Sequence, residues 1–176
     1  SQEGYEYLPS RYHLKNKIYL IPQHHCNFER AKWKQKEVVN VGFIGVPRSF
    51  RYPYNDFIEK LKPLGMNFLA YENFKNRKTV IDFYKKIDIQ VSWCPKYIAM
   101  KNPLKIVNAA SFGIPTVCYP NSAYKEMEGY YIPAKTVDEM IEKLKELKNG
   151  WDAERLIKKA EEYHIENIAK LYRSLP

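Results

Sequence analysis

The stretch KNPLKIVNAASFGIPTVCYPNSAYKEM, residues 101–127, combines a helix, a turn and a strand in one short segment. Its first half predicts a helix over residues 103–112, and Gly113 ends that helix because glycine readily adopts the positive φ needed there. The apolar run PTVCY then predicts a strand, which a polar turn carrying Glu126 follows. A helix, a tight turn and a strand in this order are typical of α/β folds.

The same alternation of strands and helices extends outward from this stretch in both directions. Most of the apolar runs lack strict alternation with polar residues, as expected for strands buried on both faces of a parallel sheet. The sequence therefore predicts a doubly wound, Rossmann-like α/β fold with helices on both faces and a C-terminal helical tail. The predicted strands are 17–22, 38–45, 67–71, 89–93, 115–119 and 130–133, and the predicted helices are 55–64, one capped by Thr79, 103–112, one capped by Thr136 over 137–148, and 152–175, bent near His164.

The composition indicates one globular domain with an anionic partner. The chain has 176 residues, of which 45% are hydrophobic, and a net charge of +9. We expect a connecting segment over residues 1–16 and a single domain over residues 17–176. Three widely spaced cysteines, no signal pattern and no apolar run long enough to span a bilayer favour a cytoplasmic location.

Four basic or flexible residues follow predicted strands, where doubly wound sheets bind their ligands. Gly45 ends the first core strand, so backbone amides there can approach an anion, and Arg48 follows in the same loop. Lys101 and Lys105 lie at the start of the helix over residues 103–112, whose dipole favours an anion. The loop after Gly45 fits an ordinary strand-to-helix connection equally well.

A single carboxylate, Glu126, follows the strand PTVCY and is suited to holding the hydroxyl groups of a ribose or a sugar. A position on the surface of a short helix explains this acid equally well. The run His24, His25 and Cys26 has no further ligand at a suitable spacing, so we expect no metal site. Neither a catalytic triad nor a carboxylate pair stands out, so the sequence does not identify the catalytic residues.

The order of these segments resembles the C-terminal domain of GT-B glycosyltransferases of the group 1, or family 4, type. IYLIPQHH, VVNVGFIG, DFYKKIDIQVSW and KIVNAASFGIPTV occur in the family's order, and a capped helix and an amphipathic tail follow them. The resemblance covers about residues 17–175. In that family this domain binds the nucleotide-sugar donor, whose sugar is transferred to an acceptor hydroxyl during glycan synthesis.

The resemblance implies a donor site in this chain. It assigns Lys105 to the donor phosphates, Gly45 and Arg48 to the phosphate-side loop, and Glu126 to the nucleotide or sugar. Asn108 stands where the family commonly has a glutamate, and the second glutamate of that pair would fall at Met100. No cofactor is expected apart from the donor itself, and no obligatory metal.

The resemblance also implies an incomplete enzyme, because a GT-B glycosyltransferase has two such domains with the active site between them. The expected partners are a nucleotide-sugar and an N-terminal acceptor domain or partner chain. Peripheral contact with a membrane is compatible with the basic surface. A non-catalytic α/β binding module for a protein or other anionic partner is the alternative. A nucleic-acid partner is disfavoured, because no RNA-recognition or helix-turn-helix pattern is present.

Overall fold

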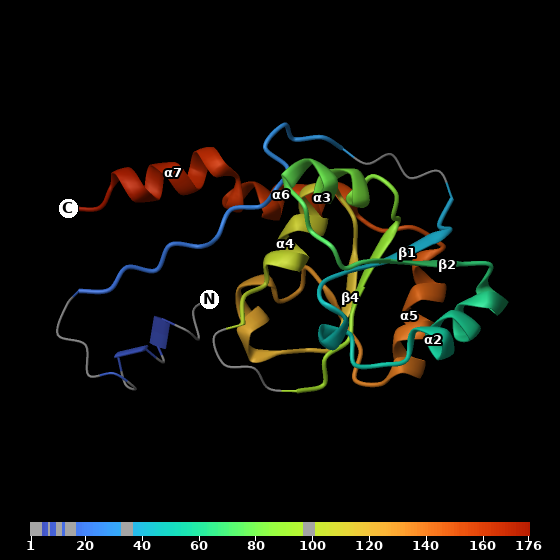
Figure 1. Ribbon diagram of the computed structural model, residues 1–176. Helices are drawn as coiled ribbons and strands as arrows, with labels where there is room; N and C mark the ends of the chain where they lie inside the picture. Colours follow the sequence, from blue (N-terminus) through green and yellow to red (C-terminus); the bar gives the residue numbers. More distant parts are fainter. Residues whose placement is uncertain (1–4, 7, 10–11, 13–16, 33–36, 97–100) are drawn as a thin grey trace.

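The computed structural model describes residues 5, 6, 8, 9, 12, 17–32, 37–96 and 101–176. Its centre is a five-stranded, all-parallel sheet with the order β2-β1-β3-β4-β5 (Figure 1). This confirms the predicted doubly wound α/β fold. The strands are β1 (Asn40–Ile44), β2 (Asn67–Tyr71), β3 (Ile89–Ser92), β4 (Thr116–Cys118) and β5 (Ile132–Pro133).

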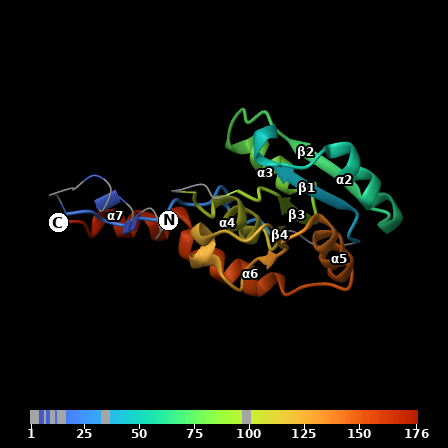
Figure 2. The same ribbon diagram turned by 90° about the horizontal axis from the view of Figure 1, so that it is seen from below.

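Helices cover both faces of the sheet, as Figures 1 and 2 show. Buried side chains of α2 and α5 pack with Val41, Phe43 and Val91 on one face. Those of α3 and α4 pack with Ile44 on the other face, and α6 lies against α4. The bounds of the α-helices are α2 (Tyr54–Leu61), α3 (Arg77–Tyr84), α4 (Leu104–Ser111), α5 (Val137–Leu147), α6 (Ala153–Ala160) and α7 (Ile165–Arg173), and those of the 3-10 turns are η1 (Pro47–Ser49), η2 (Lys62–Leu64), η3 (Ser122–Met127) and η4 (Glu161–Tyr163).

Several predicted helix ends are confirmed by their backbone geometry. Gly113 has a φ of 76° at the end of α4, and Thr136 accepts a hydrogen bond from the Glu139 amide at the start of α5. His164 is extended, with φ −66° and ψ 144°, and this breaks the helical tail into α6 with η4 on one side and α7 on the other. Each of these positions needs a backbone conformation or a cap that its residue type supplies.

The predicted cap of α3 is wrong by three residues. The helix begins at Arg77, and Asn76 is its N-cap, because the Asn76 side chain accepts a hydrogen bond from the Thr79 amide. Thr79 completes the capping box from inside the helix by accepting from the Asn76 amide. Asparagine and threonine both cap helices well. Here the asparagine lies one turn earlier, and the helix begins directly after it.

The predicted strand over residues 17–22 is also wrong, because this segment is not part of the sheet. Pro22 has no amide hydrogen to donate, and β2 and β5 already form the two edges of the sheet. The segment instead runs beside α7, away from the sheet (Figures 1 and 2).

The residues that follow this segment bind it to α4, η4 and α7 through hydrogen bonds and ion pairs. The His25 amide donates to the Tyr163 carbonyl at 3.0 Å, and Asn27 donates to the Ser111 carbonyl at 2.8 Å. Arg30 forms ion pairs with Glu161 and Glu166 at 2.9 and 2.7 Å. None of the helices in the described part of the chain combines the length and apolarity that a membrane crossing requires.

Candidate functional site

The carboxyl ends of β1 and β3 lie side by side, and the chain leaves them in opposite directions. After β1 it passes through α2 to β2 on one side, and after β3 it passes through α4 to β4 on the other. Open α/β sheets bind their ligands beyond the strand ends at such a reversal. We call this region the β1/β3 crevice. Gly45, directly after β1, and the first turn of α4 both lie at this position.

Gly45 allows two side chains to lie against its backbone. Its φ is 155°, and a Cβ atom at this position would overlap with Lys105 Nζ and lie 2.6 Å from Ser49 Oγ. Its amide donates to the Tyr71 carbonyl at 3.1 Å, which fixes the turn after β1. A larger residue would therefore push the lysine and the serine out of the crevice.

Lys105 reaches from α4 across the crevice to the loop after β1. Its ammonium group donates to Ser49 Oγ at 3.3 Å and lies 4.9 Å from the centroid of the Phe43 ring. No carboxylate pairs with it among the described residues. Burial, and to a lesser degree the charge of Lys101, lower the pKa of Lys105 to about 8. The result is a half-buried cation with no counter-ion in the described part of the chain.

The backbone of Lys105 is held by a buried glutamine of the sheet. Gln90, which is fully buried in β3, donates from Nε2 to the Lys105 carbonyl at 3.0 Å and to Thr116 Oγ1 at 2.9 Å. Its Oε1 accepts from the Tyr84 hydroxyl at 2.9 Å. This network fixes the start of α4 relative to β3, so the position of the ammonium group depends on the sheet and not on a surface loop.

The other predicted basic residues lie at the rim of this crevice. Lys101 is partly buried, and its ammonium group lies 5.1 Å from the centroid of the Tyr124 ring. Arg48 is exposed on η1, next to Ser49, and forms no ion pair within the described residues. The structure thus brings Gly45, Lys101 and Lys105 around one crevice, with Arg48 on the adjacent turn.

Asn108 does not join this group. It lies in α4 one turn beyond Lys105, and its Oδ1 accepts a hydrogen bond from the Cys26 amide at 2.8 Å. That contact ties the segment before residue 27 to α4. A direct role in ligand binding stays a prediction, and Met100, the other family position, lies outside the described residues.

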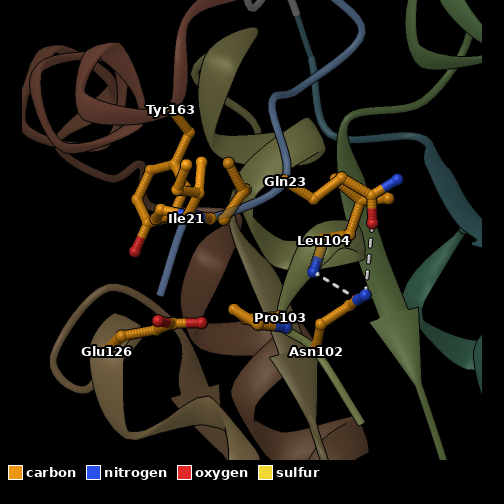
Figure 3. A pocket seen from close by; sticks show the side chains of 9 residues that line it. Ile21, Gln23, Asn102, Pro103, Leu104, Glu126 and Tyr163 are labelled. Atoms are coloured by element: carbon orange, nitrogen blue, oxygen red, sulfur yellow. Dashed lines mark hydrogen bonds between the residues drawn. The ribbon is translucent and has the colours of Figure 1, made fainter. Parts of the chain in front are cut away.

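Glu126 lies in a separate cavity on the other side of the start of α4. The cavity has a volume of about 210 Å³. Figure 3 shows the Glu126 carboxylate turned toward Pro103, with Tyr163 and Ile21 above it. The lining residues are Ile21, Pro22, Gln23, Asn102, Pro103, Leu104, Val107, Glu126 and Tyr163.

Sequence reasoning missed three side chains of these two sites. Ser49 was within reach of prediction, because it lies four residues after Gly45 in the same loop. Gln23 and Tyr163 carried no such signal, because they come from opposite ends of the chain and meet only in the folded molecule.

A larger hollow of about 340 Å³ lies beyond the carboxyl end of β2, and its two lysines, Lys75 and Lys86, are exposed to solvent. Tyr71 donates to Thr79 at 2.6 Å, and the neighbouring Lys78 pairs with Asp82 at 2.7 Å. Within the described residues, no three His, Cys, Asp or Glu side chains lie close enough together to hold a metal ion. The unpaired charge of Lys105 makes the β1/β3 crevice the stronger candidate.

Comparison with solved structures finds a structural neighbour of this chain, whereas the sequence comparisons find none. No protein-family model matches the chain, and no curated protein matches its sequence. A crystal structure at 1.35 Å of the C-terminal domain of a glycosyl transferase group 1 family protein from Francisella tularensis is similar to it, with 13% identity and a TM-score of 0.43. The match covers 88% of this chain and 96% of that one. At this level of similarity, the match says nothing about ligand or reaction.

Proposed function

We propose that this chain is the donor-binding domain of a glycosyltransferase and binds a nucleoside diphosphate-sugar. The observation that carries the proposal is the ammonium group of Lys105, which is half-buried and lies against the Gly45 backbone beyond β1. No carboxylate of residues 17–32, 37–96 or 101–176 pairs with it. A desolvated cation without a counter-ion attracts an anion strongly, because little water screens it. A diphosphate is an anion suited to this crevice.

The first turn of α4 adds to this attraction. The helix has no side-chain cap from Pro103, and its dipole places partial positive charge at its start. Asn102 Oδ1 accepts from the Leu104 amide at 3.2 Å, and the amides of Lys105 and Ile106 donate to no group among the described residues. A diphosphate above this turn would accept from those amides and from Lys105 together.

These groups would also assist the transfer step. When the bond from the anomeric carbon to the diphosphate oxygen breaks, the diphosphate keeps the electron pair and gains negative charge. Lys105 and the α4 amides stabilise that charge in place. The acceptor hydroxyl forms the new bond to the anomeric carbon and gives up its proton. We assign the acceptor site to a second domain or a partner chain, in keeping with the sequence resemblance.

The test is thermal unfolding of the chain with UDP, GDP, ADP and CDP and their common sugar conjugates. A ligand at about 100 times its Kd stabilises the folded state by roughly 2.7 kcal/mol. For a domain of this size that is a rise in Tm of roughly 5–10 °C. We expect one base to give this rise, and we expect Lys105→Ala to abolish it.

Lys145→Ala is the matched control, since it removes an exposed lysine from α5 with the same change in net charge. It should leave the ligand-induced rise in Tm unchanged. A rise in Tm that persists in Lys105→Ala would show that the diphosphate binds at another site. No rise with any nucleotide would favour the alternative of a binding module without nucleotide affinity.

A further inference from the structure

The cavity that contains Glu126 is built from three parts of the chain that are far apart in sequence. Residues 21–23 form one wall, and Glu126 and Tyr163 lie on other sides of the cavity (Figure 3). Residues 102 and 103, together with Leu104 and Val107 of α4, complete the lining. Its 210 Å³ equals the volume of about seven water molecules in the liquid. One sugar ring with its hydroxyl groups is of this size.

Two polar side chains in this cavity have no hydrogen-bond partner among the described residues. Tyr163 is only 5% exposed, and its hydroxyl forms no hydrogen bond to a described group. Glu126 is partly buried and forms neither a hydrogen bond nor an ion pair there. Unsatisfied polar groups at buried positions are rare in proteins, and a ligand is one common explanation.

The two groups are also close enough to influence each other. Burial raises the pKa of Glu126, and burial together with the charge of Glu126 raises the pKa of Tyr163. Glu126 is an acceptor when ionised, and the Tyr163 hydroxyl is both a donor and an acceptor. This pair suits hydroxyl groups, each of which donates one hydrogen bond and accepts others.

The rest of the lining adds amides and apolar surface. Asn102 donates from Nδ2 to Gln23 Oε1 at 3.2 Å, which leaves the Gln23 amide hydrogens for a ligand. Ile21, Pro22 and Val107 supply apolar contact of the kind that the C–H face of a sugar ring makes. Neither Lys nor Arg is among the lining residues, and Lys159, the cation whose charge reaches Glu126, is already paired with Glu162 at 2.7 Å. The formal charge on the wall itself is the negative charge of Glu126.

We infer that this cavity holds the sugar of the donor and selects a neutral, hydroxyl-rich sugar over one that carries a carboxylate. The inference rests on the proposed function. Asn102 and Leu104 line the cavity, and Lys105 follows them in the same helix turn. A diphosphate on Lys105 and a sugar in the cavity would therefore contact opposite sides of the start of α4. An acidic sugar would bring its carboxylate toward that of Glu126.

The experiment measures dissociation constants by calorimetric titration near neutral pH. The ligands are UDP with UDP-glucose and UDP-glucuronic acid, and GDP with GDP-mannose and GDP-mannuronic acid. We expect the neutral conjugate to bind about tenfold tighter than the bare diphosphate, which is the effect of one good hydrogen bond to a charged group. The acidic conjugate should bind no tighter than the bare diphosphate.

Two substitutions separate the sugar contact from the phosphate contact. Glu126→Gln should remove the tenfold gain of the neutral conjugate, improve the acidic one, and leave the Kd of the bare diphosphate within about twofold. Tyr163→Phe should reduce the gain in the same selective way. Glu128→Gln changes an exposed carboxylate two residues away and should alter none of these values.

Each outcome separates the two proposals. If the bare diphosphate binds through Lys105 but the neutral conjugate binds no tighter, the sugar site is overturned and the donor-binding function stands. If Glu126→Gln weakens the bare diphosphate as much as the conjugate, Glu126 serves the phosphate site or the fold and the sugar site is again overturned. If no nucleotide binds at all, both proposals fail.

Discussion

At the scale of single residues, the crevice depends on a cation that the fold leaves without a counter-ion. Lys105 contacts a hydroxyl and the face of an aromatic ring, and neither group neutralises its charge. Holding an amine in this way costs stability, since burial favours its neutral form. A ligand that supplies negative charge removes that cost. Functional sites are the places where proteins commonly keep such unfavourable groups.

The first prediction at this scale concerns pH. Lys105 has a pKa of about 8, so its charge falls as the pH rises from about 7 to about 9. We expect the affinity for a nucleoside diphosphate to fall over this range, because Lys105 loses its charge while the phosphates, with a last pKa of about 6, are already largely ionised. Titrations at several pH values would measure it. Lys105→Arg, which stays charged, should show no such decline, and a flat profile in the native chain would contradict the assignment.

The second prediction concerns Gly45. Replacing Gly45 with alanine places a methyl group where Lys105 Nζ and Ser49 Oγ now lie. We expect Gly45→Ala to abolish nucleotide binding and to lower stability by about 1–3 kcal/mol. Gly65 also has a positive φ, of 65°, but nothing lies within 4 Å of its added Cβ. Gly65→Ala should therefore lower stability, measured in urea, and keep nucleotide binding. Equal loss of binding in both variants would show that strain alone is responsible.

At the scale of elements, the sequence predicted the sheet well because its strands are short, buried and separated by clear helix signals. β1, β2, β3 and β4 and all five predicted helices are present, the last of them divided into α6 and α7, with ends shifted by a few residues. Local signals could not say that residues 17–22 stay outside the sheet, because an apolar run of this length is equally compatible with a cavity wall. Local signals also could not predict the hydrogen bond from the Cys26 amide to Asn108, because the two residues are 82 positions apart in the sequence.

One element-scale prediction follows from Asp88, which precedes β3. Its carboxylate accepts hydrogen bonds from the amides of Val39 and Asn40, at 3.0 and 2.7 Å, and so joins the starts of β1 and β3. Asp88→Ala would leave both amides without this acceptor, and we expect a loss of about 2–4 kcal/mol in urea unfolding. Asp56→Ala, which removes an exposed carboxylate, should cost well under half as much. Similar losses in the two variants would show that the carboxylate of Asp88 does not hold the strands together.

At the scale of the whole molecule, the two candidate sites share one structural origin. Both flank the first turn of α4, and that turn is positioned by Gln90 in the central strand β3. The anion crevice uses neighbours from the loop after β1, and the cavity uses residues 21–23, which precede the sheet in sequence, and Tyr163, which follows it. The residues of the anion crevice could be predicted from the sequence, because they follow strands whose ends the pattern indicates. Those of the cavity could not, because they come together only in the folded chain.

The contacts of Arg30 with Glu161 and Glu166 have a consequence for how the protein is made. They join residues 131 and 136 positions apart, and the His25 amide reaches Tyr163 in the same region. A ribosome releases the chain from its beginning, so residues 25–30 wait for their partners until most of the domain has emerged. The cavity wall at residues 21–23 is therefore completed after the parallel sheet has formed, and a nascent chain lacking its last helices has a sheet but only part of the cavity.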